Sequence, residues 1–338
     1  MASIAKAPFV SIIISTRNRP HLFQIALRSV LSQSFAEKEV IAVIDGSTDE
    51  NLAQYRNLKT QYPNVMFREL EHRPNGHGQS FTMNYGVVTA SGEYVCFLDD
   101  DDYWIDDQYL ANLFDNITAC RTPVDVHYSN QKAVFADGVA QQENVWIQDL
   151  IPKLDPKNVN HGDSYLVDAQ FLLSSSGFAH LNCTVLKRKF FLALGGMDES
   201  IRYENDRDVY IRSVDAASVI LFSTRFMSLH NIPDISQKNN MSTVSTSIDK
   251  KLFQLRVYDK GIAQSKKAIV MRFCCTAKGY ELKHTARILA SYGAHRSAAY
   301  YAKEALFVGF NLRWLAYTFW LMGQAAFRTS KNFIESHG

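Results

Sequence analysis

Apolar residues along the first hundred positions follow two alternating periods. Short runs rich in β-branched residues predict strands at 10–16, 39–50, 65–70 and 94–98, the second of which runs into an Asp-Gly turn. Apolar residues at helical spacing predict helices at 21–34, 51–62 and 78–91. Strand and helix therefore alternate, and this order predicts an α/β fold with a mostly parallel sheet flanked by helices.

The pattern changes twice further along the chain. Residues 110–180 are polar and aromatic without a clear period, and we expect acceptor contacts to form there. Beyond residue 248 the spacing is helical throughout, which predicts two domains, 1–248 and 249–338. At the N-terminus, Ser11, Ser15 and Thr16 interrupt the apolar run, so we interpret 1–16 as a buried first strand rather than a leader.

Charge is distributed unevenly over the 338 residues. From Lys250 to the end there are 15 lysines and arginines against 4 acidic residues, a balance of +11. Since the whole chain carries +2, the first 249 residues carry −9. A basic segment suits an anionic surface, either a bilayer or nucleic acid, or packs against the acidic part of its own chain. The apolar run 314–322 is too short to span a bilayer but could lie on one.

Five scattered cysteines without metal-ligand spacing indicate neither a disulfide framework nor a zinc site. This pattern favours the reducing cytoplasm.

Four consecutive carboxylates, Asp99 to Asp102, follow the apolar strand 94–98. Such neighbours repel one another, and a divalent cation with hard oxygen ligands would compensate. An acidic loop that caps a following helix is the alternative. Asp45 also follows a strand, and the carboxyl ends of parallel strands meet at the edge where ligands bind. The placement therefore favours a metal or ligand site.

Four segments in order resemble the motifs of the family 2 glycosyltransferases with the GT-A fold. They are VSIIISTRNRPHLFQIALRSVLSQS, VIDGSTDE, NGHGQSFTMNYGVVTASGEYVCFLDDDDYW and GGMDESIRYENDRDVYIRS, and the resemblance covers roughly residues 8–230. It implies a nucleotide-sugar donor, with a UDP-sugar favoured, a Mg²⁺ or Mn²⁺ cofactor and transfer with inversion. The implied acceptor is a glycan or lipid-linked hydroxyl, in cell-surface polysaccharide or glycolipid synthesis at the cytoplasmic face of an anionic membrane. No nucleic acid partner is expected.

The resemblance also assigns residues to the donor site. Asp101 would bind the metal directly, and Asp99 would reach the metal or the ribose. Asp45 would accept a hydrogen bond from the nucleobase in a pocket lined by Thr16. Asp100 is a further candidate for the nucleotide-sugar site. Asp100 and Asp102 are also candidates to support the metal ligands or to cap the following helix, and His230 is a candidate as a late histidine near the metal. Trp104 is a candidate to stack on a sugar or to anchor the core.

Inversion requires a base opposite the leaving group. Asp206 resembles the catalytic aspartate of the family, with Glu204 in reserve because Asn205 replaces the usual glutamate. Ile44 and Met83 also depart from the family pattern, which leaves the nucleotide open. Two other classes remain as alternatives. A sugar nucleotidyltransferase needs a glycine-rich phosphate loop that RNRPHLF lacks, and an EF-hand needs a glycine and a glutamate at positions that DDDD does not supply.

Overall fold

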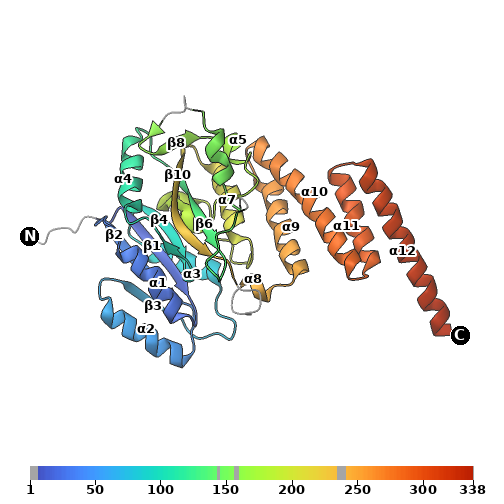
Figure 1. The fold of residues 1–338 in the computed structure, drawn as a ribbon, viewed down its shortest axis with the longest axis horizontal. Coiled ribbons are helices and arrows are strands. Elements are labelled where there is room, and N and C mark those ends of the chain that lie inside the picture. Colours follow the sequence, from blue (N-terminus) through green and yellow to red (C-terminus); the bar gives the residue numbers. More distant parts are fainter. Residues whose placement is uncertain (1–6, 143–144, 156–159, 234–240, 338) are drawn as a thin grey trace, which may run out of the picture. The chain divides into compact units, whose positions relative to one another are not determined.

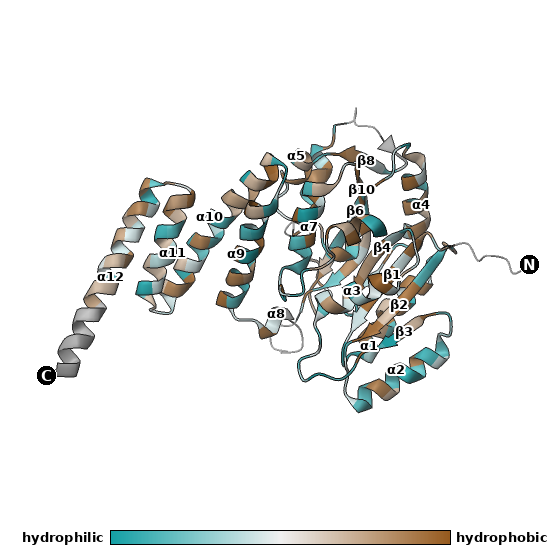
Figure 2. Cartoon of the chain, turned by 180° about the vertical axis from the view of Figure 1, so that it is seen from behind, coloured by the Kyte–Doolittle hydropathy of each residue, from teal (hydrophilic) through white to brown (hydrophobic). Residues whose placement is uncertain are grey.

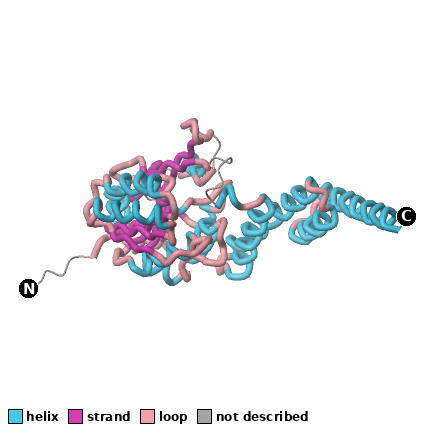
Figure 3. The backbone as a smooth tube through the Cα atoms, turned by 90° about the horizontal axis from the view of Figure 1, so that it is seen from below, coloured by secondary structure: helices cyan, strands magenta, loops and turns pink. Residues whose placement is uncertain are grey.

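The computed structural model describes residues 7–142, 145–155, 160–233 and 241–337. These form two compact units, Met1–Gln237 and Lys238–Gly338. Residues 1–6 of the predicted N-terminal strand lie outside the described residues. Figure 1 shows strands at the centre of the first unit with helices on both sides, and Figure 3 shows the helices of the second.

The predicted alternation of strand and helix is confirmed in the first hundred residues. Its elements are β1 (Val10–Thr16), α1 (Pro20–Leu31), β2 (Lys38–Ile44), α2 (Asp49–Gln61), β3 (Met66–Glu69), α3 (Gln79–Thr89) and β4 (Tyr94–Asp99). The strands are parallel neighbours in the order β3-β2-β1-β4. Ser15 of β1 lies opposite Asp99 of β4, and Thr16 lies opposite Ile44 of β2. The carboxyl ends of β1, β2 and β4, which carry the candidate residues, therefore lie at the same edge of the sheet.

The second half of the first unit has a mixed topology. Its elements are β5 (Tyr103–Trp104), α4 (Tyr109–Ala119), β6 (Val126–Val134), η1 (Gln148–Lys153), β7 (Asn160–His161), β8 (Ser164–Val167), α5 (Ala169–Leu172), η2 (Leu181–Cys183), β9 (Thr184–Lys187), α6 (Arg188–Ala193), α7 (Asn205–Ala216) and β10 (Ile220–Asn231). Strand β9 pairs antiparallel with both β4 and β6, and β10 runs parallel to β6. Among the described residues, the sheet thus continues past β4 as β9-β6-β10-β8-β7, with β5 against β10. The described sheet is therefore mixed rather than mostly parallel as predicted, because the strands after β4 pair antiparallel except β6 with β10.

Alternate side chains of β1 bury the two faces of the sheet. Ile12 and Ile14 belong to the same apolar cluster as Phe23 and Leu27 of α1. Ile13 faces α3, where a Cβ on Gly86 would lie 2.5 Å from Ile13 Cγ2. A glycine at this position therefore lets α3 approach the sheet closely. Figure 2 shows the apolar character of the central strands.

The second unit consists of α8 (Met241–Val244), α9 (Ser247–Gln264), α10 (Ala268–Ser291), α11 (His295–Val308) and α12 (Leu312–His337). Helix α9 begins at a capping box in which the Thr246 side chain accepts from Asp249 N and the Asp249 side chain accepts from Thr246 N. Buried alanines of α11 pack with Trp314 and Leu321 of α12. The Trp314 indole also donates a hydrogen bond to the Ala302 carbonyl (2.9 Å), which joins α12 to α11.

Candidate active site

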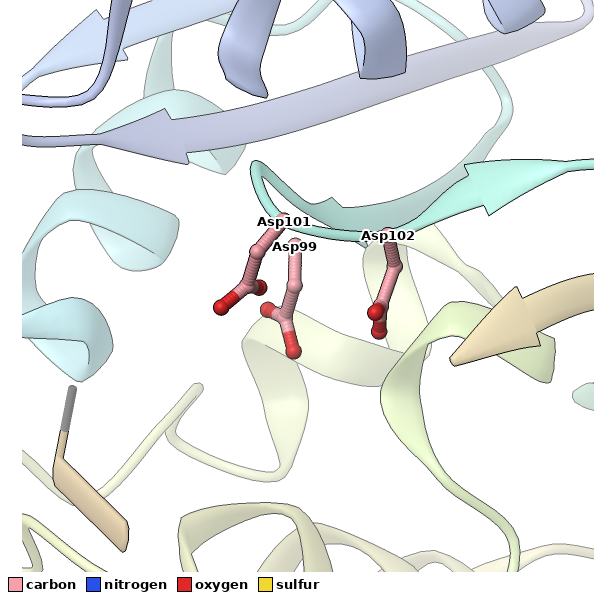
Figure 4. Close-up of side chains that lie close together, drawn as sticks. All are labelled: Asp99, Asp101 and Asp102. Atoms are coloured by element: carbon pink, nitrogen blue, oxygen red, sulfur yellow. The ribbon is translucent and has the colours of Figure 1, made fainter. Parts of the chain in front are cut away.

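Three carboxylates gather at the turn after β4. One oxygen from each of Asp99, Asp101 and Asp102 lies within 4.8 Å of the others. Figure 4 shows the three side chains leaving the turn toward the same side. Burial raises the pKa of Asp99 well above its ordinary value, and the neighbouring Asp102 and Asp101 raise it further. A hard divalent cation would remove this repulsion, so the donor set fits Mg²⁺ or Mn²⁺.

Arg19, in the turn after β1, holds the other side of this turn. Its guanidinium pairs with Asp100 through Nη2 and Nε, and its Nη1 lies 2.8 Å from Asp101 Oδ2. Thr16 also donates a hydrogen bond to Asp100 Oδ2 (2.7 Å). Burial lowers the pKa of Arg19, but Asp100 and Asp101 overcome this effect and raise it. Asp100 therefore anchors the turn, and Asp101 faces both Arg19 and the carboxylate group.

Asp102 connects the turn to the last strand of the unit. This buried side chain accepts hydrogen bonds from Asn182 Nδ2 (2.6 Å) and Asn231 N (2.8 Å), and its Oδ2 lies 2.8 Å from His230 Nδ1. Although burial alone lowers the pKa of His230, Asp102 raises it to about 9. The structure thus brings His230, a candidate from the sequence, to the carboxylate group through Asp102.

Asp206 lies across from the acidic turn, at the start of α7. Burial raises its pKa to about 6, and Glu204 adds to the rise. His180 stands between the two, because its Nε2 lies 3.8 Å from Asp99 Oδ2 and 3.8 Å from Asp206 Oδ2. Its Nδ1 accepts a hydrogen bond from Asn182 N (3.3 Å), which places the proton of the neutral ring on Nε2, toward both carboxylates. Burial and then the nearby His230 lower the pKa of His180 to about 3.

Glu204 occupies a different environment from Asp206. It is the residue before α7, with a backbone φ of 67° in the left-handed region. Its carboxylate forms an ion pair with Arg207, whose guanidinium lies 4.1 Å from the centre of the Phe178 ring. Glu204 and Asp206 therefore differ, since a cation engages the Glu204 carboxylate and the Asp206 carboxylate faces His180.

Asp45 lies at the end of β2 and is held by a neighbouring loop. Its carboxylate accepts hydrogen bonds from His77 N (2.7 Å) and Gly78 N (3.0 Å). A Cβ on Gly76 would lie 2.4 Å from Asp45 Oδ2, so the loop needs glycine there both for space and for its φ of +66°. The structure thus joins Thr16 to the acidic turn through Asp100, and joins Asp45 to the loop that precedes α3.

Sequence reasoning missed several residues of the site. Gln79 Nε2 donates to Asp99 Oδ1 (2.6 Å), and Asn182 Oδ1 accepts from Asp99 N (2.9 Å). The Trp146 ring contacts His180 and His230 edge to face, with centroids 5.9 and 5.3 Å away. Of these residues, only Gln79 comes from a motif segment. Trp104, the aromatic candidate from the sequence, is buried in the core against Tyr109, so it anchors the core rather than facing a sugar.

Comparison with known proteins identifies the family. The model of the family described as "Glycosyl transferase family 2" matches residues 11–190, more than half of the chain. The chain belongs to glycosyl transferase family 2. This confirms the resemblance drawn from the four ordered motifs.

The relatives of this family 2 chain include bacterial glycosyltransferases. It is 27% identical over 255 residues to an uncharacterized glycosyltransferase of Rickettsia felis, a match that covers 70% of this chain and 37% of that protein. It is 35% identical over 98 residues to a GalNAc(5)-diNAcBac-PP-undecaprenol beta-1,3-glucosyltransferase of Campylobacter jejuni, covering 28% of this chain and 30% of that protein. The matches thus span about a third of the length of these relatives.

Solved structures confirm the GT-A fold. S. aureus TarS 1–349 in complex with UDP-GlcNAc aligns with a TM-score of 0.62 and 16% identity, over 93% of this chain and 87% of that one. The mannosyltransferase PcManGT of Pyrobaculum calidifontis, in complex with GDP-Man and Mn²⁺, aligns with a TM-score of 0.55 and 17% identity, over 95% and 87%. The predicted fold class is therefore confirmed for this family 2 chain.

Proposed function

We propose that this family 2 chain is an inverting glycosyltransferase, which moves a sugar from a nucleotide diphosphate to an acceptor hydroxyl. One observation carries the proposal: His180 Nε2 lies 3.8 Å from Asp99 on one side and 3.8 Å from Asp206 on the other. A cation-binding group and a candidate base thus flank one ring. Inversion needs this division, because the base acts on the face opposite the leaving group.

The cation side of the site would consist of Asp101 and Asp99, with His230 close by through Asp102. A bound Mg²⁺ or Mn²⁺ would act as a Lewis acid that neutralises the charge developing on the diphosphate leaving group. Asp100 and Arg19 hold the turn from behind, so that the carboxylates do not have to reorganise when the donor binds. Thr16 and Asp45 would line the nucleoside pocket.

Asp206 is the base in this proposal. At neutral pH a carboxyl whose pKa is raised to about 6 is mostly ionised, yet it is more basic than an ordinary aspartate. Glu204 remains the reserve candidate, but its carboxylate is paired with Arg207, whereas Asp206 is the carboxylate that faces His180.

The donor we propose is a UDP-sugar, and the acceptor is a hydroxyl of a glycan or lipid-linked molecule. TarS was solved with UDP-GlcNAc, which supports the nucleotide. The name of the Campylobacter relative gives an undecaprenol-linked acceptor, and a relative from Bacillus spizizenii is a poly(ribitol-phosphate) beta-glucosyltransferase. We therefore place the chain in cell-surface polysaccharide or glycolipid synthesis in the cytoplasm, where its five cysteines would stay free thiols. Residues 1–248 would form the catalytic domain.

A donor screen tests the proposal. The full chain is incubated with a panel of nucleotide sugars, with Mn²⁺ or with EDTA, and release of the nucleoside diphosphate is measured. Metal-dependent release from one UDP-sugar, lost in Asp206→Asn while UDP binding is retained, is the expected result. Release of pyrophosphate from a nucleoside triphosphate and a sugar phosphate would instead identify a nucleotidyltransferase. Stabilisation by Ca²⁺ without any nucleotide effect would identify a calcium-binding module.

A further inference from the structure

Helix α12 is apolar on two sides, of which only one is packed. Trp314 and Leu321 are buried in the core of the second unit. By contrast, Leu312, Phe319 and Phe327 have 72%, 63% and 71% of their surface exposed. Their spacing places these three side chains on one face of the helix, a stripe about 22 Å long at 1.5 Å per residue. The exposed face has no charged residue between them, since it continues through Ala316, Trp320 and Gly323.

Helix α11 exposes a second stripe. Arg296, Tyr300, Lys303 and Phe307 follow one another at intervals of four, three and four residues, so they share a face, and all four are exposed. Phe307, at its end, has 87% of its surface exposed. This stripe leads into the loop before α12, where Phe310 is 68% exposed. The two stripes therefore meet at a turn surrounded by aromatic side chains, and Figure 2 shows apolar residues along both helices.

Exposed apolar surface of this extent calls for a partner, and charge indicates which one. The segment from Lys250 onward carries a balance of +11, so that a second copy would meet it with like charge. An anionic surface is complementary, and neither stripe contains an acidic residue. Aromatic side chains flanked by lysine and arginine are typical of helices that lie in the interfacial plane of a bilayer. None of the described helices combines the length and apolar character needed to cross one.

We propose that the two stripes and the turn between them, here called the α11–α12 surface, dock on the headgroup region of an anionic bilayer. Phe307, Phe310 and Phe319 enter the acyl boundary, and Arg296 and Lys303 contact the lipid phosphates. The docking surface thus includes only part of the apolar run 314–322, because Trp314 and Leu321 of that run are packed inside the unit. This interaction does not depend on the proposed sugar transfer.

Vesicle flotation tests the α11–α12 surface. The full chain is mixed with vesicles of phosphatidylcholine, with or without phosphatidylglycerol, and the floated fraction is measured. The triple variant Phe307→Ser, Phe310→Ser and Phe319→Ser should bind anionic vesicles at least about tenfold more weakly. Val88→Ser is the control, because Val88 is an apolar residue of comparable exposure (71%) that lies on α3 of the first unit. Unchanged thermal unfolding and UDP binding of the triple variant would show that it folds.

A second variant tests the charge. Arg296→Gln with Lys303→Gln should weaken binding only to vesicles that contain phosphatidylglycerol, and added salt should have the same effect. Equal flotation of the triple variant and the wild type would overturn the proposal. So would concentration-dependent oligomers of the wild type that the triple variant loses while neither protein binds vesicles, because the surface would then join copies of this chain.

Discussion

We expect Asp206→Asn to lower the rate of transfer while raising the free energy of unfolding at high pH, because the environment of this carboxyl opposes its charge. Burial raises its pKa from 3.8 to about 6, with a further contribution from Glu204. A carboxyl with a higher pKa in the folded state binds more protons when folded, so the free energy of unfolding falls as pH rises between these two values. A difference of about two pKa units corresponds to about 3 kcal/mol. The ionised carboxylate thus destabilises the folded protein above about pH 6.

Asparagine removes the charge and keeps the shape. Its Oδ1 can still accept the hydrogen bond from Arg207 N, which is 2.8 Å from Asp206 Oδ1. We therefore expect Asp206→Asn to have little effect on the free energy of unfolding at about pH 4 and to raise it by up to about 3 kcal/mol at about pH 8. Transfer should fall by a factor of about 10² to 10⁴, the usual effect of losing a general base. Wild-type transfer should increase as pH rises through about 6, as Asp206 ionises.

Urea unfolding at both pH values, in EDTA so that no cation changes the local field, measures the first effect, and a transfer assay measures the second. Glu204→Gln is the control. It removes the ion pair with Arg207, so it should lower the free energy of unfolding at about pH 8 and leave transfer within about tenfold of wild type. The reasoning is refuted if Asp206→Asn destabilises the protein equally at both pH values, or if it retains transfer while Glu204→Gln loses it.

Three further changes test other parts of the site. Asp101→Asn should abolish Mn²⁺-dependent UDP binding by calorimetry, and unchanged affinity would remove Asp101 from the cation site. Arg19→Gln leaves the buried Asp100 without its cation and should lower the free energy of unfolding in urea by about 3 kcal/mol. The control Arg56→Gln breaks an exposed ion pair and should lower it by under about 1 kcal/mol. Equal losses in the two variants would contradict this expectation. We propose that His180, whose Nε2 faces Asp206 Oδ2 at 3.8 Å, positions this base, so His180→Gln should lower kcat roughly tenfold with the donor KM unchanged; a change in KM alone would argue against that role.

The sequence predicts best the elements and candidate sites that are formed by residues close together in the chain. The alternation of runs such as 94–98 with helical segments predicted the parallel strands, and the level ends of β1, β2 and β4 follow from that topology. The acidic turn could be predicted as a candidate site because it is a short contiguous motif, and the start of α7 became a candidate because a contiguous segment resembles a family motif. His230 was found only through the resemblance, since a single histidine in a strand has no local signal of its own.

His180, Trp146 and Asn182 could not be predicted in this way. They lie within or just after the segment whose polar and aromatic residues show no period, in which η1, β7 and β8 are short and the pairing of β6 with β10 shifts register. Their contacts join distant positions, as with Asn182 and Asp102, which are 80 residues apart. Periodicity reports which face of an element is buried but does not report which distant residue covers it.

The hydrogen bonds of Asp102 bear on when, during synthesis of the chain, the protein becomes able to bind a donor. This side chain is buried, and its partners His230 and Asn231 come 128 and 129 residues later, at the end of β10. Closing so long a loop is entropically costly and is repaid only once the strands between are in place. A ribosome-bound chain that has not yet produced β10 would therefore lack two of the three hydrogen-bond partners of Asp102 and hold this carboxylate through Asn182 alone. The ability to bind a donor should thus appear late in synthesis, after the parallel strands have formed.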